Sequence, residues 1–228
     1  MTSPRSEDEL AGVDDPAWPD IARMASEAPL VVEILPVRGS EGRRTLYRLQ
    51  VTARSTLGAI ALNCGGLIID RGWLRILGAG APGLDDLATA NNLGDPVEVS
   101  PAPGQLVIAY DILGGVFAIN HHDIAAPAGE VCYWGPDTLA WSPLGVGHSA
   151  FIRWALGGGL SDFYRDFRWP GWETQVAATP IEDGISVYPF LWTEQGRNID
   201  SSSRRAVPFT EILELNQKFA REVAAGPK

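Results

Sequence analysis

Hydrophobic positions follow helical spacing near both ends of the chain and form short, strand-like runs between them. Apolar residues three and four positions apart predict one helix within residues 15–28 and two helical pieces within 45–63. From residue 65 to 142, runs such as LVIAY and EVCYW are rich in β-branched and aromatic residues and are separated by glycine-containing turns, which is typical of hairpin-linked strands. Helical spacing then returns and ends with a helix over 208–225.

This order of elements predicts an α+β domain. Helices, then a block of strands, then helices favour a largely antiparallel sheet with helices packed on one side, because the regular βα alternation of parallel sheets is absent. The first thirteen residues are polar and acidic and lack apolar periodicity, so they cannot bury enough surface to offset the entropy lost on ordering. We therefore expect residues 1–13 to be disordered and residues 14–225 to form a single domain.

The charge of the chain bears on its partners. The formal net charge is −10, and the field of such a chain repels phosphate backbones and anionic membranes. We therefore expect neither nucleic acid nor a membrane as a partner, whereas a basic protein is a partner that this field would attract. The first residues hold no apolar run of the kind found in secretory signals, and no later stretch reaches about 18 uninterrupted apolar residues, so we expect a cytoplasmic protein.

Three histidines are the candidates for catalytic or metal chemistry. His121, His122 and Asp123 are consecutive, and imidazole and carboxylate groups suit zinc or iron. A hydrolase that uses His121, Asp123 or His148 with a metal ion is therefore one hypothesis. Adjacent side chains on a strand point to opposite sides, however, so the pair His121–His122 is more typical of a solvated loop. Ser149, next to His148, is expected to cap a helix rather than to act as a nucleophile.

A glycine-rich segment, GAGAPG at 78–83, fits the GxGxxG pattern of dinucleotide-binding turns. The surrounding βα units of that fold are absent, and Pro82 removes one N–H donor that a pyrophosphate would need. Asp85 and Asp86 follow in the first turn of a short predicted helix, where their charge would compete with a bound pyrophosphate. We therefore expect a simple turn, and no cofactor.

The segment DFYRDFRWPGWE concentrates five aromatic side chains in twelve positions. Phe163 and Phe167 lie four residues apart on one face of a predicted helix. The Pro-Gly turn after them lets Trp169 and Trp172 fold back over the same apolar surface. A structural role is therefore favoured, with Phe167 and at least one of the two tryptophans buried against the sheet. A carbohydrate-binding platform stays open as the alternative.

Distinctive longer segments of the chain include GGLIIDRGWLRILGAG, EVCYWGPDTLAW, FIRWALGGGLSDFYRDFRWPGWE and GISVYPFLW. They resemble an uncharacterised bacterial family of domains of unknown function, family 2625, and the resemblance covers most of residues 15–215. The order of a strand pair, a glycine turn, an aromatic hairpin and a helix of the SAFIRWAL kind is also similar to the SUKH superfamily of immunity-type binding proteins. This second resemblance implies an α+β fold and a non-catalytic role in binding another protein, for example a toxin.

Two functions from different classes follow. The favoured one is a non-catalytic cytoplasmic protein-binding module, of immunity type, with an acidic face or a groove beside the sheet as its working surface. The alternative is a hydrolase in which His121, Asp123 or His148 acts with a metal ion. The first hypothesis predicts a stable protein without bound metal, and the second predicts stoichiometric zinc or iron.

Overall fold

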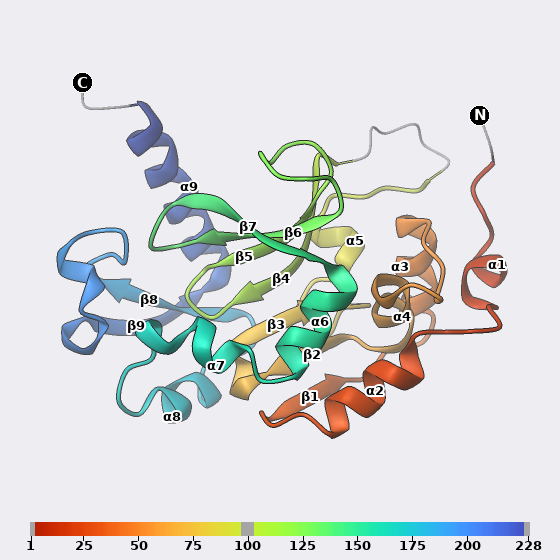
Figure 1. The fold of residues 1–228 in the computed structure, drawn as a ribbon, viewed down its shortest axis with the longest axis horizontal. Coiled ribbons are helices and arrows are strands. Elements are labelled where there is room, and N and C mark those ends of the chain that lie inside the picture. Colours follow the sequence, from red (N-terminus) through yellow and green to blue (C-terminus); the bar gives the residue numbers. More distant parts are fainter. Residues whose placement is uncertain (1–2, 97–102, 226–228) are drawn as a thin grey trace.

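The computed structural model describes residues 3–96 and 103–225 of the chain (Figure 1). In that part of the chain, a seven-stranded antiparallel sheet runs in chain order from its first strand to its last, which confirms the expected largely antiparallel sheet. Its strands are β1 (Val32–Leu35), β2 (Gly66–Ile69), β3 (Leu74–Leu77), β4 (Gln105–Asp111), β5 (Val116–Asn120), β6 (Glu130–Gly135) and β7 (Ala140–Gly147). Two later strands, β8 (Asp183–Tyr188) and β9 (Ser203–Pro208), pair with each other in a separate sheet.

Helices complete the α+β class that the sequence predicted. The α-helices are α1 (Glu7–Ala11), α2 (Trp18–Ser26), α3 (Glu41–Leu49), α4 (Thr56–Asn63), α5 (Leu87–Ala90), α6 (His148–Leu156), α7 (Leu160–Phe163), α8 (Trp172–Ala177) and α9 (Phe209–Ala225). Helices α2, α4 and α6 pack against one another, and α6 also contacts β6 and β7. Helix α9 contacts β8 and β9, at the end of the molecule away from α1 and α3 (Figure 1). Within the described residues, none of the helices is long and apolar enough to cross a membrane.

Strand register separates the two faces of the large sheet. Ile76, Ala109 and Phe117 are cross-strand neighbours in β3, β4 and β5, so their side chains share one face. The ring of Phe117 lies 5.0 Å from that of Phe151, centroid to centroid, which places α6 over this face. Arg75 is next to Ile76 in β3, and its side chain therefore lies on the opposite face.

A buried carboxylate closes the β4–β5 hairpin. Asp111 ends β4, is fully buried, and accepts hydrogen bonds from the backbone N–H groups of Leu113 and Gly115, each at 2.9 Å. It also accepts bonds from the hydroxyl of Tyr133 at 2.8 Å and from that of Tyr164 at 3.0 Å. Burial raises the pKa of Asp111 and of both tyrosines, because their charged forms lose hydration there. The carboxylate thus joins the hairpin, β6 and the segment after α7.

The N-terminal segment is folded, so the expectation of disorder over residues 1–13 is wrong for its helical part. Helix α1 begins with a capping box, in which the Ser6 hydroxyl accepts from the Glu9 N–H and the Glu9 carboxylate accepts from the Ser6 N–H at 2.7 Å. Leu10 is completely buried, and its carbonyl accepts a hydrogen bond from the Ala53 N–H at 2.9 Å. One buried leucine and two local hydrogen bonds thus anchor a segment whose composition is polar.

The aromatic segment DFYRDFRWPGWE packs on Trp73, which is fully buried. The ring centroids of Trp169 and Trp172 lie 5.8 Å and 5.0 Å from that of Trp73. Trp169 is 2% exposed, and its indole N–H has no acceptor among the described residues. Phe167 is only half-buried, contrary to the prediction, because the helix ends at Phe163 and the chain continues into a 3₁₀ turn that aims the next ring differently.

Replacing Leu10 by alanine should lower the free energy of unfolding by about 2–5 kcal/mol, because a fully buried leucine loses its transfer free energy and leaves a cavity. Chemical denaturation of the purified variant measures this change. Val223→Ala is the control, since Val223 is 66% exposed and its truncation should change stability by less than about 0.5 kcal/mol. Parental stability of Leu10→Ala would contradict the packed position of α1.

Truncation of two side chains in the aromatic segment should lower the free energy of unfolding by different amounts. Trp169→Ala should lower the free energy of unfolding by about 3–5 kcal/mol, because the ring is enclosed, and Phe167→Ala should cost clearly less. Denaturation curves of the two variants, measured side by side, give the comparison. A negligible cost for Trp169→Ala would show that the segment does not support the core.

Candidate functional site

A cavity with a volume of about 720 Å³ lies between the end of α3, the start of α4, the residues after α5 and the strands β4 and β5. We refer to it as the α3–β5 hollow. Its apolar lining includes Leu49, Leu57, Leu93, Leu106 and Ile119. Polar side chains in its lining include Arg48, Gln50, Asn91 and His121.

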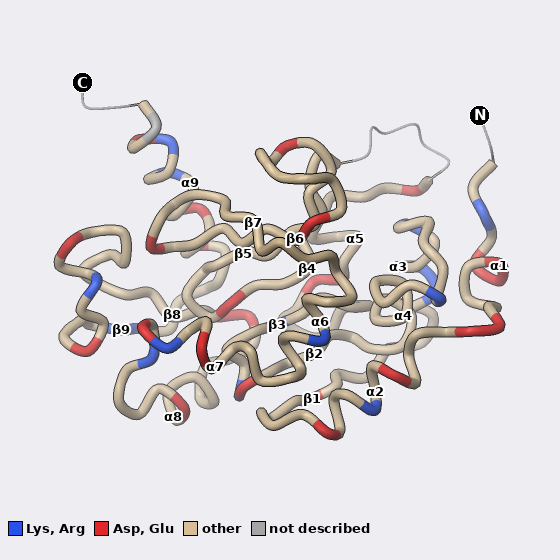
Figure 2. Tube along the Cα trace, viewed as in Figure 1, with Lys and Arg blue, Asp and Glu red and all other residues tan. Residues whose placement is uncertain are grey.

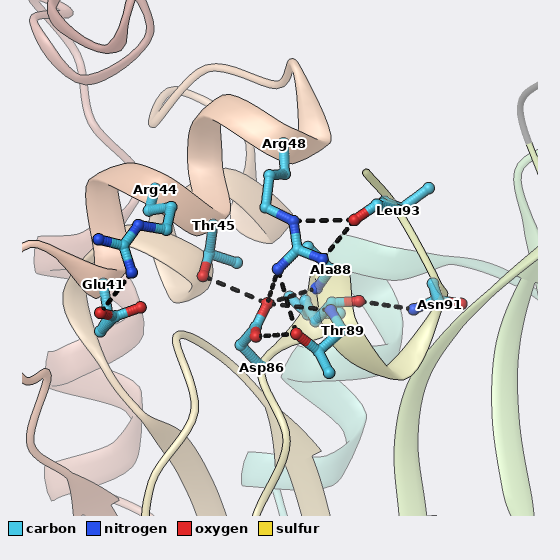
Figure 3. Close-up of polar contacts among 10 residues, drawn as sticks. Glu41, Arg44, Thr45, Arg48, Asp86, Ala88, Thr89, Asn91 and Leu93 are labelled. Atoms are coloured by element: carbon cyan, nitrogen blue, oxygen red, sulfur yellow. Dashed lines mark hydrogen bonds and ion pairs between the residues drawn. The ribbon is translucent and has the colours of Figure 1, made fainter. Parts of the chain in front are cut away.

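An ion pair between α3 and the start of α5 borders this hollow (Figure 3). Asp86 caps α5 by accepting hydrogen bonds from the N–H groups of Ala88 at 2.8 Å and Thr89 at 3.1 Å. The Arg48 guanidinium lies 3.4 Å from the same carboxylate and donates through Nε to the Leu93 carbonyl at 2.8 Å. Both charges are therefore compensated inside the protein, and the residues after α5 are held against α3.

Hydrogen bonds of two amide side chains, Asn91 and Asn120, hold other parts of the wall of the α3–β5 hollow in place. The Asn91 amide donates to the carbonyls of Leu87 and Val107, both at 2.8 Å, and its oxygen accepts from the Val107 N–H at 2.6 Å. The Asn120 amide donates to the carbonyl of Ile124 and accepts from its N–H, both at 3.0 Å. Because these amides already bond to the backbone, the hollow presents mainly apolar surface to an occupant.

The candidate histidines have different surroundings. His121 and His122 are exposed in the loop after β5, and the Nδ1 of His121 lies 3.3 Å from the Pro103 carbonyl oxygen. The Nε2 of His122 and the Oδ1 of Asp123 lie 3.6 Å apart, on side chains that are both well exposed. Across the described residues, no cluster of three or more His, Cys, Asp or Glu side chains is arranged to hold a metal ion. Within the described residues, His121, Asp123 and His148 therefore do not form a common metal-binding site.

Residues 7–212 match the model of a family described as a protein of unknown function, DUF2625. The chain belongs to this family. Among its relatives, the putative uncharacterised protein YbfG of Escherichia coli (strain K12) is 37% identical over 220 residues, which are 94% of this chain and 97% of YbfG. An uncharacterised protein of Haemophilus influenzae is 29% identical over 187 residues, which are 80% of this chain and 79% of that protein. Family membership is confirmed, whereas the similarity to the SUKH superfamily stays a prediction.

In this DUF2625 chain, His148 differs from the other two histidines. Its Nδ1 is buried without a hydrogen-bond partner among the described residues, and burial lowers the pKa of the ring to about 4. The ring is therefore neutral at neutral pH. The prediction that Ser149 caps the helix is wrong, because α6 begins at His148 and Gly147 takes the N-cap position. The Ser149 hydroxyl instead lies 2.8 Å from that of Thr56, so it joins α6 to α4.

The GAGAPG segment forms a turn before α5. Gly80 and Gly83 have φ angles of 86° and 78°, in the left-handed region that favours glycine. The Leu87 N–H donates to the Gly78 carbonyl at 2.9 Å, and the next two N–H groups of α5 donate to Asp86. As the sequence predicted, an acidic side chain occupies the helix start where a pyrophosphate would bind.

The loss of stability on acidification should depend on His148. Its pKa is lowered by folding, so the unfolded chain binds the proton first as the pH falls. The neutral ring therefore makes its full contribution to the free energy of unfolding above about pH 6.5, and this contribution is lost progressively as the pH falls toward about 4. Urea denaturation at about pH 7.5 and pH 5 should show a smaller loss for His148→Gln than for the parent, by on the order of 1–2 kcal/mol.

His122→Gln is the matched control for this measurement, because the same replacement falls on an exposed ring. It should lose as much stability as the parent between the two pH values. An identical pH dependence of His148→Gln and the parent would show that the His148 ring is accessible to protons in the folded protein. The double variant His121→Ala/His122→Ala should melt within a few degrees of the parent, since both rings are surface groups.

Proposed function

We propose that the protein is a non-catalytic, cytoplasmic protein-binding module whose partner places an apolar side chain in the α3–β5 hollow. The observation that supports this function most is the hollow itself, with its volume of about 720 Å³ and its apolar lining. Pockets that hold ligands have about 300–1,000 Å³ and a mainly apolar lining with a few placed polar groups. Partner side chains that fill such pockets supply much of the binding free energy in protein complexes.

Two groups whose pKa is raised by burial, Asp111 and Cys64, are enclosed, which favours binding over catalysis. The Asp111 carboxylate is fully buried and its oxygens are occupied by four donors. Cys64 is a buried free thiol, and burial raises its pKa to about 12, which keeps it protonated and unreactive at neutral pH. The neutral ring of His148 is buried at its Nδ1. A general base or a nucleophile has to reach its substrate, and the buried Asp111 carboxylate and Cys64 thiol lack that access.

Charge favours a basic partner. The net charge is −10, and Figure 2 shows Asp and Glu positions in many parts of the described chain, from α1 to the loops beside β8 and β9. The long-range field therefore speeds the encounter with a basic protein, while the hollow supplies the specific contact. The similarity to the SUKH superfamily favours an immunity-type role, with a toxin as this partner.

Filling the hollow tests the proposed function. Leu93→Trp places an indole in the hollow, and the Leu93 carbonyl can still accept from Arg48, so the wall is kept. Val223→Trp is the matched control, because it adds the same indole at an exposed position of α9. Both variants should melt within a few degrees of the parent.

Binding is measured first by capture from a lysate of the encoding bacterium and then with the purified captured protein. We expect one basic protein to bind the parent and Val223→Trp equally, and Leu93→Trp at least about tenfold more weakly, which is a loss of about 1.4 kcal/mol. Raising the salt concentration should weaken all three complexes. Equal binding by Leu93→Trp and the parent, or failure to capture any protein partner, would overturn the proposal.

A further inference from the structure

A second cavity, with a volume of about 480 Å³, lies on the face of the large sheet opposite α6. The cross-strand neighbours Glu33, Ile68 and Arg75 line it from β1, β2 and β3. Arg38, in the loop after β1, and Arg71, in the turn between β2 and β3, complete its charged lining. We refer to it as the arginine hollow. Its lining is cationic, although the net charge of the chain is −10.

Arg75 is a fixed, buried cation of this hollow. The residue is 3% exposed, and its guanidinium donates to the carbonyls of Ile181 and Asp183, both at 2.6 Å, and of Gly72 at 3.3 Å. Burial lowers the pKa of Arg75 to about 10, which leaves the side chain charged at neutral pH. In the part of the chain that the structure describes, no carboxylate lies within 4.0 Å of this guanidinium, so its charge is met by carbonyl dipoles alone at close range.

Arg38 and Arg71 are the available cations. Both residues are exposed, and neither guanidinium forms a hydrogen bond or an ion pair within 4.0 Å among the described residues. Each guanidinium carries five N–H donors in a planar fork. The hollow therefore combines one positive charge that is locked in place with two that are free to bind an anion.

The turn that carries Arg71 has an unusual backbone conformation. Asp70 and Arg71 have φ angles of 55° and 63°, in the left-handed region that favours glycine. An ion pair with Arg168 holds Asp70 in place, and the Arg168 guanidinium itself lies over the Trp172 ring, 4.3 Å from its centroid. Strain of this kind persists where the surrounding structure imposes it, and it recurs at ligand sites. The imposed turn brings Arg71 into the lining of the hollow.

We propose that the arginine hollow binds a small organic oxyanion, a carboxylate or phosphate ester with an apolar body. Arg38 and Arg71 bind the anionic group, because guanidinium forks match carboxylate and phosphate oxygens in paired hydrogen bonds. Ile68 and Ile181 offer apolar contact to the body of the ligand. The volume of about 480 Å³ suits a small molecule, and the net charge of −10 disfavours extended polyanions. This site is separate from the α3–β5 hollow and does not depend on the protein-binding function.

Three aromatic compounds serve as probes of the full chain. Benzoate and phenyl phosphate each combine an oxyanion with an apolar ring, and benzamide is the neutral counterpart of benzoate. Titration calorimetry at constant ionic strength should show saturable binding of at least one of the two anions and a clearly weaker signal for benzamide. A preference for phenyl phosphate assigns the site to phosphate esters, and a preference for benzoate assigns it to carboxylates.

Arg71→Gly separates ligand binding from folding. Glycine removes the guanidinium and also relieves the left-handed φ, so the variant should melt at the parental temperature or above it. It should bind the preferred anion at least about tenfold more weakly, and Arg38→Ala should weaken binding as well. Arg44→Ala is the control, because Arg44 pairs with Glu41 and lies outside the lining of the hollow, and its anion affinity should match that of the parent.

Three results would each overturn the proposal. The first is that neither anion binds saturably to the parent, and the second is that benzamide binds as tightly as benzoate. The third is that Arg71→Gly, folded as judged by its melting temperature, keeps the parental affinity for the anion. Weaker binding by Arg71→Gly with unchanged binding by Arg44→Ala supports the site.

Discussion

Four hydrogen-bond donors converge on the carboxylate of Asp111, which is fully buried. A carboxylate in an apolar interior costs several kcal/mol unless its oxygens are hydrogen-bonded. Two donors come from the turn after β4, and the others are the hydroxyls of Tyr133 in β6 and of Tyr164 after α7. If β6 or the segment after α7 moved away from this turn, the Tyr133 or Tyr164 hydroxyl and the Asp111 carboxylate would lose a hydrogen bond in the buried interior. This one side chain therefore joins the β4–β5 turn, β6 and the segment after α7.

The turn that Asp111 closes also positions the small sheet. The Ile112 N–H donates to the Trp73 carbonyl at 2.9 Å, and the Ile112 carbonyl accepts from the Ile185 N–H of β8 at 2.7 Å. Arg75, whose positive charge Asp111 stabilises electrostatically, binds the carbonyls just before and within the start of β8. The β8–β9 pair and the helix α9 that packs on it thus depend on the same turn. This dependence makes the buried wall of the arginine hollow rigid, because Arg75 cannot turn away without releasing β8.

The strand block was predictable because its runs are strongly apolar and because glycine and aspartate mark its turns. The strand β9 was not predicted, because its segment carries two arginines and only Val207 in it is buried. The sequence of this segment therefore shows no alternation of apolar and polar residues. α1 was missed because only Leu10 of that helix is buried, although the capping box of Ser6 and Glu9 is visible in the sequence and signals a helix start. The half-buried position of Phe167 depends on the change from an α-helix to a 3₁₀ turn, which local spacing does not encode.

Neither hollow could be found from the sequence, because distant segments form the walls of both. Arg48 and Asp86 are 38 positions apart and meet only through the packing of α3 on α5.

The two hollows differ in what their polar groups already bind. Around the α3–β5 hollow, Arg48 and Asn91 have partners inside the protein, so apolar contact is the main gain of an occupant there. In the arginine hollow, Arg38 and Arg71 have no hydrogen-bond partner within residues 3–96 and 103–225, so an occupant would gain charge-assisted hydrogen bonds that this part of the chain does not make. The same distinction separates Asp111 from a functional acid, since its buried oxygens already accept hydrogen bonds from four donors of the protein.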